Sequence, residues 1–272
     1  MPLSRPLLAA VLFASALAAS LPVLAQAPYH FGAPVSAFAL PDELEEISGL
    51  TLLDEGHVGA VQDEEGDLFV VSLATGEVVR EEGFGDDGDY EGIELVGERL
   101  FVMTADARVT ELLDWRTDDI RTVEYDLDLG RERCNAEGLG ADGESLVIVC
   151  KNEDGGDDNR VYGIDVDALP GLKPERRFDI DRGDVPGRKH KKKLRPSALA
   201  RHPMTGHLVV LSSRRETLVS LDAEGAVVSV WDFGEADLEQ PEGLAFLPNG
   251  DVLISSEGKK GPGVIMRFAW RG

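Results

Sequence analysis

The feature that most constrains the fold is a five-residue segment that occurs five times along the chain. Its central residues are separated by 43, 46, 60 and 45 positions, and they are Ser48, Glu91, Glu137, Ser197 and Glu242. A repeat of about 40 to 50 residues is typical of propellers and solenoids, in which every copy forms one structural unit. The repeat therefore decides the architecture before any local motif is considered.

The sequence after each copy distinguishes between these two architectures. Short apolar segments alternate with turns rich in Gly, Asp and Asn, and in the first repeat the expected strands are 50–53, 57–61, 68–73 and 78–82. Four such strands make one blade of a β-propeller. The longest interval contains the extended connections 154–159 and 182–194, so it does not require a sixth blade.

A single apolar segment, 33–40, precedes the first repeat and has no neighbouring partner strand. In a closed propeller such a strand completes the last blade and removes an open sheet edge. We expect it to pair with the C-terminal strand at 264–270. The predicted fold is thus an all-β, five-bladed β-propeller.

The N-terminal segment 1–27 has the pattern of a signal peptide. Arg5 supplies a positive charge, 7–24 is almost wholly apolar or small, and Ala25-Gln26-Ala27 provides small residues for cleavage. A retained membrane anchor is the alternative. We expect cleavage, no stable membrane insertion afterwards, and a bacterial periplasmic or secreted protein in which 28–272 form a single domain.

The net charge limits the classes of partner. The full chain carries 27 basic and 51 acidic side chains; removing Arg5 leaves 26 − 51 = −25. Such a charge favours solubility and cations and opposes binding to nucleic acid. The basic run 188–193 is best explained as an exposed loop, or as a loop that steers anions towards the channel.

Two cysteines, Cys134 and Cys150, flank one predicted hairpin whose turn is 142–144. In that hairpin they fall almost opposite one another, within reach of a disulfide if the register allows. Either a disulfide, which export permits, or two buried thiols fits the sequence.

The repeated segments resemble those of the SdiA-regulated family of exported bacterial β-propellers. The residues that carry the resemblance are Glu46-Ile47-Ser48-Gly49-Leu50, Asp89-Tyr90-Glu91-Gly92-Ile93, Asn135-Ala136-Glu137-Gly138-Leu139 with Cys150-Lys151, Leu194-Arg195-Pro196-Ser197-Ala198-Leu199 with His202-Pro203-Met204-Thr205-Gly206, and Gln240-Pro241-Glu242-Gly243-Leu244. The resemblance covers nearly all of 28–272 and implies five blades, but it implies no particular activity. Lactonase and esterase-like phytase propellers are more distantly similar.

The repeat also predicts a site, because the start of each first strand lies nearest the axis of a propeller. Three carboxylates then converge at one channel mouth and repel one another. Calcium, or magnesium, is one candidate for compensating this charge. The expected metal ligands are Glu91, Glu137, Glu242, Asn135 and Asn152. The alternatives are ion pairs with Lys151 and Arg195, or hydrogen bonds from backbone N–H groups of the neighbouring blade.

A second polar column is expected at the ends of the second strands, where it would either face solvent or border a ligand pocket. In the second case basic groups would meet a small anionic ligand. The expected ligand-binding residues are Ser48, Asp63, Lys151, Arg195, Ser197, Arg214 and Glu257.

Two functions fit these residues, and no Gly-x-Ser-x-Gly elbow, His-Glu-x-x-His helix or dinucleotide fingerprint favours another. The first is a binding or scaffold protein with a divalent-cation site at the channel mouth. The second is a metal-dependent hydrolase of esters, phosphate esters or lactones, with Glu91, Glu137 or Glu242 as general base.

Overall fold

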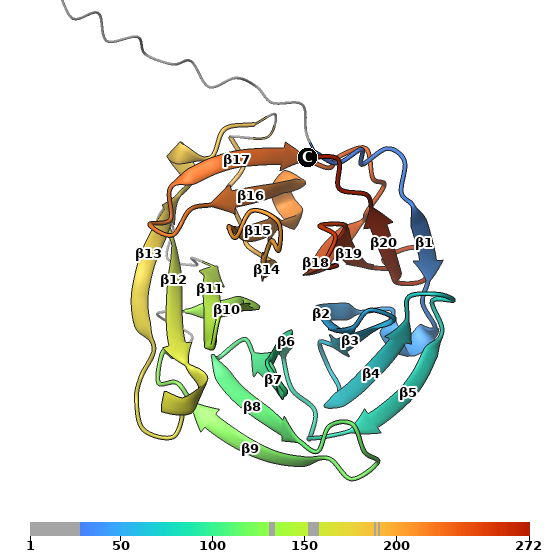
Figure 1. The fold of residues 1–272 in the computed structure, drawn as a ribbon, viewed down its shortest axis with the longest axis vertical. Helices are drawn as coiled ribbons and strands as arrows, with labels where there is room; N and C mark the ends of the chain where they lie inside the picture. The colour runs from blue at the N-terminus through green and yellow to red at the C-terminus, as the bar shows by residue number, and fades with distance from the viewer. Residues whose placement is uncertain (1–27, 131–133, 152–157, 188, 190) are drawn as a thin grey trace, which may run out of the picture.

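The computed structural model describes residues 28–272 except 131–133, 152–157, 188 and 190. Within this part of the chain, twenty strands form five antiparallel sheets of four strands each, arranged like blades around one axis (Figure 1). The predicted five-bladed propeller is therefore confirmed.

The first four blades each follow the chain from the axis outwards (Figure 1). Blade one consists of β2 (Ile47–Asp54), β3 (His57–Gln62), β4 (Asp67–Ser72) and β5 (Val78–Gly83). Blade two consists of β6 (Tyr90–Val96), β7 (Arg99–Thr104), β8 (Arg108–Leu113) and β9 (Arg121–Asp126). Blade three consists of β10 (Asn135–Asp142), β11 (Ser145–Lys151), β12 (Asp158–Asp165) and β13 (Glu175–Asp181). Blade four consists of β14 (Ala198–Arg201), β15 (Leu208–Ser212), β16 (Thr217–Leu221) and β17 (Val227–Asp232).

Blade five is assembled from both ends of the chain, as the sequence predicts. It consists of β18 (Gln240–Phe246), β19 (Val252–Glu257), β20 (Val264–Phe268) and, outermost, β1 (Ser36–Ala39). The pairing of β1 with β20 aligns Ser36 with Arg267 and Ala39 with Val264. This pairing closes the ring (Figure 1), so that residues distant in sequence must fold together.

Short 3₁₀ helices, which the sequence did not predict, occupy some connections. In the described chain they are η1 (Asp42–Leu44), η2 (Val166–Ala168), η3 (Arg182–Asp184) and η4 (Ser213–Arg215). The helix η4 follows β15 directly, at the channel mouth considered below. Alternating strand periodicity gives no signal for such single turns.

The core lies between the blades rather than in one central mass. Each of five apolar clusters joins residues of two adjacent blades, as Val61 of β3 and Val102 of β7 do between blades one and two. Burial between sheets that face each other is what holds a propeller together, since a single blade cannot bury both of its faces.

The segment before β1 is also anchored in this core. Tyr29 is buried, and its hydroxyl donates to the Gly250 carbonyl at 2.8 Å and accepts from His202 Nε2 at 2.9 Å. His202 is fully buried, and its Nδ1 accepts the Met204 N–H at 3.1 Å. These bonds attach residue 29 to blades four and five.

Candidate functional site at the channel mouth

The central residue of the repeated segment occupies a β-bulge in four of the five blades. In blade three, Ala136 pairs with Cys150 and Gly138 pairs with Val149, so that Glu137 is the extra residue. The same irregularity places an extra residue at Ser48, Glu91 and Glu242. An extra residue leaves the ladder and turns its side chain away from the regular alternation. The repeat therefore encodes a bulge at the start of the inner strand.

The glycine that follows the bulge is required by close contact between blades. A Cβ on Gly138 would lie 2.8 Å from the Ala198 carbonyl carbon of blade four, and one on Gly92 would lie 2.8 Å from Leu139 Cβ of blade three. Contacts this short are repulsive, so the inner strands can approach this closely only without a side chain here. The Glu-Gly and Ser-Gly pairs thus have a packing explanation.

The two serines of the column join neighbouring blades. Ser48 Oγ donates to the Tyr90 carbonyl at 2.6 Å, and Ser197 Oγ donates to the Pro241 carbonyl at 2.9 Å. Both serines are about 95 % buried and each acceptor belongs to the next blade. Both therefore stabilise the ring at the positions where the sequence suggested ligand contacts.

Glu91 and Glu242 line the central channel, which at this level has a volume of only about 10 Å³. That space is comparable to one water molecule. Burial and repulsion from nearby carboxylates, Glu137 foremost, raise the pKa of Glu91 to about 9. Burial, Glu257 and Glu137 raise the pKa of Glu242 well above its ordinary value. The repeated column does bring these carboxyl groups together.

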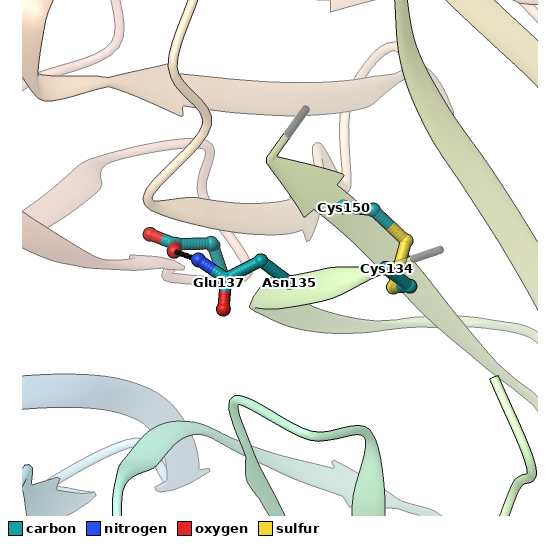
Figure 2. The surroundings of a disulfide bond; sticks show 4 residues. All are labelled: Cys134, Asn135, Glu137 and Cys150. Carbon is teal, nitrogen blue, oxygen red and sulfur yellow. Dashed lines mark hydrogen bonds between the residues drawn. A yellow bond between two sulfur atoms is a disulfide. The ribbon is translucent and has the colours of Figure 1, made fainter. Parts of the chain in front are cut away.

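The third carboxylate, Glu137, has a different environment. Its Oε1 accepts from Lys151 Nζ at 2.6 Å and from Asn135 Nδ2 at 2.5 Å. Figure 2 shows the Asn135 amide directed at the Glu137 carboxylate. The ion pair with Lys151, one of the alternatives to a cation, is therefore observed for Glu137.

A disulfide joins Cys134 to Cys150, close to Asn135 and Glu137 (Figure 2). The sequence left the state of these cysteines open. Cys134 precedes Asn135 and Cys150 precedes Lys151, which are the first aligned pair of the β10–β11 hairpin. The bridge thus fixes the ends of the two strands that carry Glu137 and its partners.

The remaining predicted site residues lie at the start of an inner strand or the end of its neighbour. Gln240 aligns with Glu257 and donates to its carboxylate at 2.6 Å. Asp63 directly follows β3, and Arg195 lies three residues before β14. Arg214 is exposed on η4. Asn152 lies outside the described residues.

One carboxylate near the axis was missed in the sequence. Glu94 lies on β6, three residues after Glu91, where the other blades have Thr51, Gly140, Ala200 and Ala245. Burial raises its pKa to about 8, against hydrogen bonds from the Leu95 N–H and the Thr51 hydroxyl. A charged residue in an otherwise small or neutral column was the signal that could have identified it.

The donor set at the mouth suits a hard cation in part. Carboxylate and amide oxygens are the ligands that calcium and magnesium prefer, and the half-buried Glu91 and Glu242 gain from a nearby positive charge. Among the residues that the structure describes, however, no group of three or more His, Cys, Asp or Glu side chains is arranged to hold a metal ion. Lys151 already compensates Glu137, so Glu91 and Glu242 are the carboxylates that remain for a cation.

Over the described ranges, which begin at residue 28, no helix is long and apolar enough to span a membrane.

Comparison with known proteins identifies the family and the fold. The model of the SdiA-regulated family matches residues 27–268. No curated protein matches the chain. Among solved structures, glutaminyl cyclase from Myxococcus xanthus superposes with a TM-score of 0.61 at 18 % identity, over 88 % of this chain and 96 % of that one.

Two further structures are similar. The PQQ-bound aldose sugar dehydrogenase from Streptomyces coelicolor has a TM-score of 0.53 at 15 % identity, over 87 % of this chain and 99 % of that one. The calcium-binding protein regucalcin from Agrobacterium tumefaciens has a TM-score of 0.51 at 13 % identity, over 90 % and 95 %. At these identities the similarity establishes the fold alone.

Proposed function

The chain belongs to the SdiA-regulated family, which by itself implies no activity, and from the site we propose that it is an exported binding protein whose channel mouth holds a divalent cation and a small anionic ligand. The cation is calcium or magnesium. The observation that carries the proposal is the convergence of Glu91, Glu137 and Glu242, whose carboxylates repel one another beside a cavity of about 10 Å³ that Glu91 and Glu242 line.

The electrostatics of the pair Glu91 and Glu242 support a cation. Two half-buried carboxyl groups whose pKa values are raised must either stay protonated or gain a positive neighbour. Glu91 and Glu242 would hold the cation, and the Asn135 side-chain oxygen is a further candidate because its Nδ2 faces Glu137. When bound, the cation would supply positive charge that attracts an anionic ligand and polarises its oxygen atoms.

The basic side chains of blades three and four support the anionic ligand. Lys151 is the last residue of β11, Arg195 lies three residues before β14, and Arg214 lies on η4 beyond β15. Arginine suits carboxylate and phosphate groups because it offers several N–H donors in a fixed plane. These three residues are therefore the proposed contacts of the anion.

Export to the periplasm or out of the cell is part of the proposal. The 1–27 segment, which has the composition of a signal peptide, lies outside the described residues. The Cys134–Cys150 disulfide agrees with an oxidising compartment. Mass spectrometry of the protein recovered from a periplasmic extract tests this point, since cleavage should leave a chain that starts near residue 28.

Elemental analysis of protein purified without chelator tests the cation directly. We expect about one calcium or magnesium per chain and a calcium-dependent rise in melting temperature that EDTA reverses. The variant E242Q should lose most of this rise, whereas D54N, on a distant and exposed hairpin turn, should keep it. An unchanged melting temperature at millimolar calcium and magnesium would refute the cation site.

A metal-dependent hydrolase of esters, phosphate esters or lactones is the second candidate. It is favoured by the unlike surroundings of two neighbouring carboxyl groups, since Glu91 has a pKa of about 9 while Glu137 is paired with Lys151. Environments that separate two carboxyl groups in this way are typical of acid and base pairs. Turnover of generic substrates with calcium, lost in E137Q without loss of folding, would favour the hydrolase; calcium binding without turnover would favour the binding protein.

A further inference from the structure

The strand registers place two rings of side chains around the mouth, one opposite the other. Asn135 at the start of β10 aligns with Lys151 at the end of β11, and Gln240 aligns with Glu257 in the same way in blade five. In blade one, Ile47 aligns with Gln62, so that the residues just beyond them, Glu46 and Asp63, face each other. Blades one, three and five therefore each contribute one facing pair to the mouth.

The facing pair of blade one consists of two carboxylates. Repulsion from Asp63 is the main cause that raises the pKa of Glu46. Burial is the main cause for Asp63, whose Oδ1 is buried and has no hydrogen-bond partner among the described residues. Repulsion from Asp63 and from Glu46 also helps to raise the pKa of Glu257 in blade five. The negative charge of blades five and one is therefore concentrated in one half of the mouth.

Blade two continues this acidic half. Asp89 directly precedes β6 and its carboxylate contributes to the raised pKa values of both Glu91 and Asp63. The backbone N–H of Ala105, which follows β7, donates to the Asp89 carbonyl at 2.8 Å. The pair of blade two therefore brings a negative and a neutral side chain.

Blades three and four have the opposite character. Lys151 of blade three offsets the charge of Glu137, with which it is paired, so Arg195 of blade four supplies the positive charge of this side. The Arg195 backbone N–H donates to Ser212 Oγ at 3.3 Å, whereas its side-chain Nε is buried and has no hydrogen-bond partner within the described chain. A buried donor without a partner costs free energy, and a ligand acceptor would remove that cost.

Asp63 and Arg195 belong to blades that are not adjacent in the ring. Blade five separates Asp63 from Arg195 on one side, and blades two and three separate them on the other (Figure 1). Among the residues that the structure describes, the mouth thus has an acidic side with the unpartnered Asp63 Oδ1 and a basic side with the unpartnered Arg195 Nε.

We propose that the ligand of this mouth is zwitterionic, a short peptide or amino acid whose ammonium group binds Glu46 and Asp63 while its carboxylate binds Arg195. The inference rests on the proposed function, since it names the class of ligand for the same site. A singly charged ligand satisfies one half and leaves the other uncompensated, so the mouth selects molecules that carry both charges.

Three small probes test the ligand class, because they differ only in their terminal charges. Glycylglycine carries both charges, glycylglycinamide carries only the ammonium, and N-acetylglycylglycine carries only the carboxylate. We expect chemical-shift titrations at low ionic strength, with EDTA and again with calcium, to give at least a tenfold lower Kd for glycylglycine than for either analogue.

Two variants assign the two ends of the probe. R195Q should weaken glycylglycine to the affinity of glycylglycinamide and leave that amide unchanged. D63N should weaken it to the affinity of the acetylated probe. The control R201Q removes an exposed arginine at the end of β14 that is away from the mouth, where it pairs with Asp142 of blade three. This variant should change none of the three affinities. The melting temperature of each variant shows that it is folded.

The probe titrations and the calcium-dependent melting temperature distinguish a failure of the zwitterionic ligand from a failure of the cation site. Equal affinities for the three probes, or no binding of any, would overturn the zwitterionic ligand. If calcium still raises the melting temperature in a manner that E242Q abolishes, the cation site stands while the ligand class falls. If neither calcium nor any probe binds, both fall.

Discussion

Lys151 of β11 donates from Nζ to Glu137 Oε1 of β10 over 2.6 Å, which joins the second strand of blade three to the bulge of its first. The Glu137 side chain is only 6 % exposed and that of Lys151 22 %. The pair therefore holds a carboxylate that would otherwise be buried without compensation beside two other carboxyl groups.

Replacing Lys151 with Met should destabilise the protein by about 3 kcal/mol, because it leaves Glu137 charged and largely buried. Urea unfolding measures the loss. The double variant K151M/E137Q should recover part of it, since the carboxylate is then absent. The control K173M removes an exposed pair with Asp128 and should cost less than about 1 kcal/mol. Equal losses for K151M and K173M would show that the buried pair does not matter.

Replacing Gly138 with Ala should cost about 1–3 kcal/mol, because the added methyl group would lie 2.8 Å from the Ala198 backbone and 2.9 Å from the Leu199 nitrogen. Gly171 is a matched control, since a Cβ there meets nothing within 4 Å. Its replacement with Ala should be neutral or slightly stabilising. Thermal unfolding of the two variants compares them, and a neutral G138A would contradict the close approach of blades three and four.

Breaking the Cys134–Cys150 disulfide should destabilise the protein by about 3 kcal/mol, the value expected for a loop of about 15 residues. The double variant C134S/C150S measures this by urea unfolding. We also expect weaker ligand binding at the mouth, because the bridge lies beside Asn135 and Lys151. A variant as stable as the parent would show that β10 and β11 are held without the bridge.

His202 should make the protein sensitive to mild acid. Burial lowers its pKa from 6.5 to about 4 in the folded protein. The unfolded chain therefore binds this proton first as the pH falls, and stability is lost between about pH 6.5 and pH 4, by on the order of 2–3 kcal/mol at the lower limit. H202Q, although less stable at pH 7, should lose less stability between pH 7 and pH 5 than the parent does. An equal loss in both would exclude His202 as the source.

The blade architecture could be predicted because it depends on local patterns that the chain repeats. Short alternating segments and Gly-containing turns indicated the strands, and the single strand 33–40, which has no neighbouring partner, placed β1 against β20. The position of the acidic column followed from the repeat as well. These features depend on backbone geometry, and the residue types along the chain indicate that geometry directly.

The chemistry of individual side chains could not be predicted in the same way. The bulges that displace Glu91 and Glu137 shift the ladder by one residue, and a sequence pattern does not show which residue becomes the extra one. The column alone also does not reveal that Ser48 and Ser197 bond to the next blade while Glu137 pairs with Lys151. Those choices depend on distances between blades, which local sequence does not specify.

The most direct test of the account is the titration of Glu91, because it reports whether the repeated column delivers its carboxyl groups to a common axis. Carboxyl-carbon NMR of the metal-free protein and of E137Q measures it. We expect Glu91 to titrate near pH 9 in the parent and at a clearly lower pH in E137Q, which removes one repelling charge and frees Lys151. A Glu91 that titrates near pH 4.5 in both proteins would contradict the convergence of the three glutamates and the functions proposed from it.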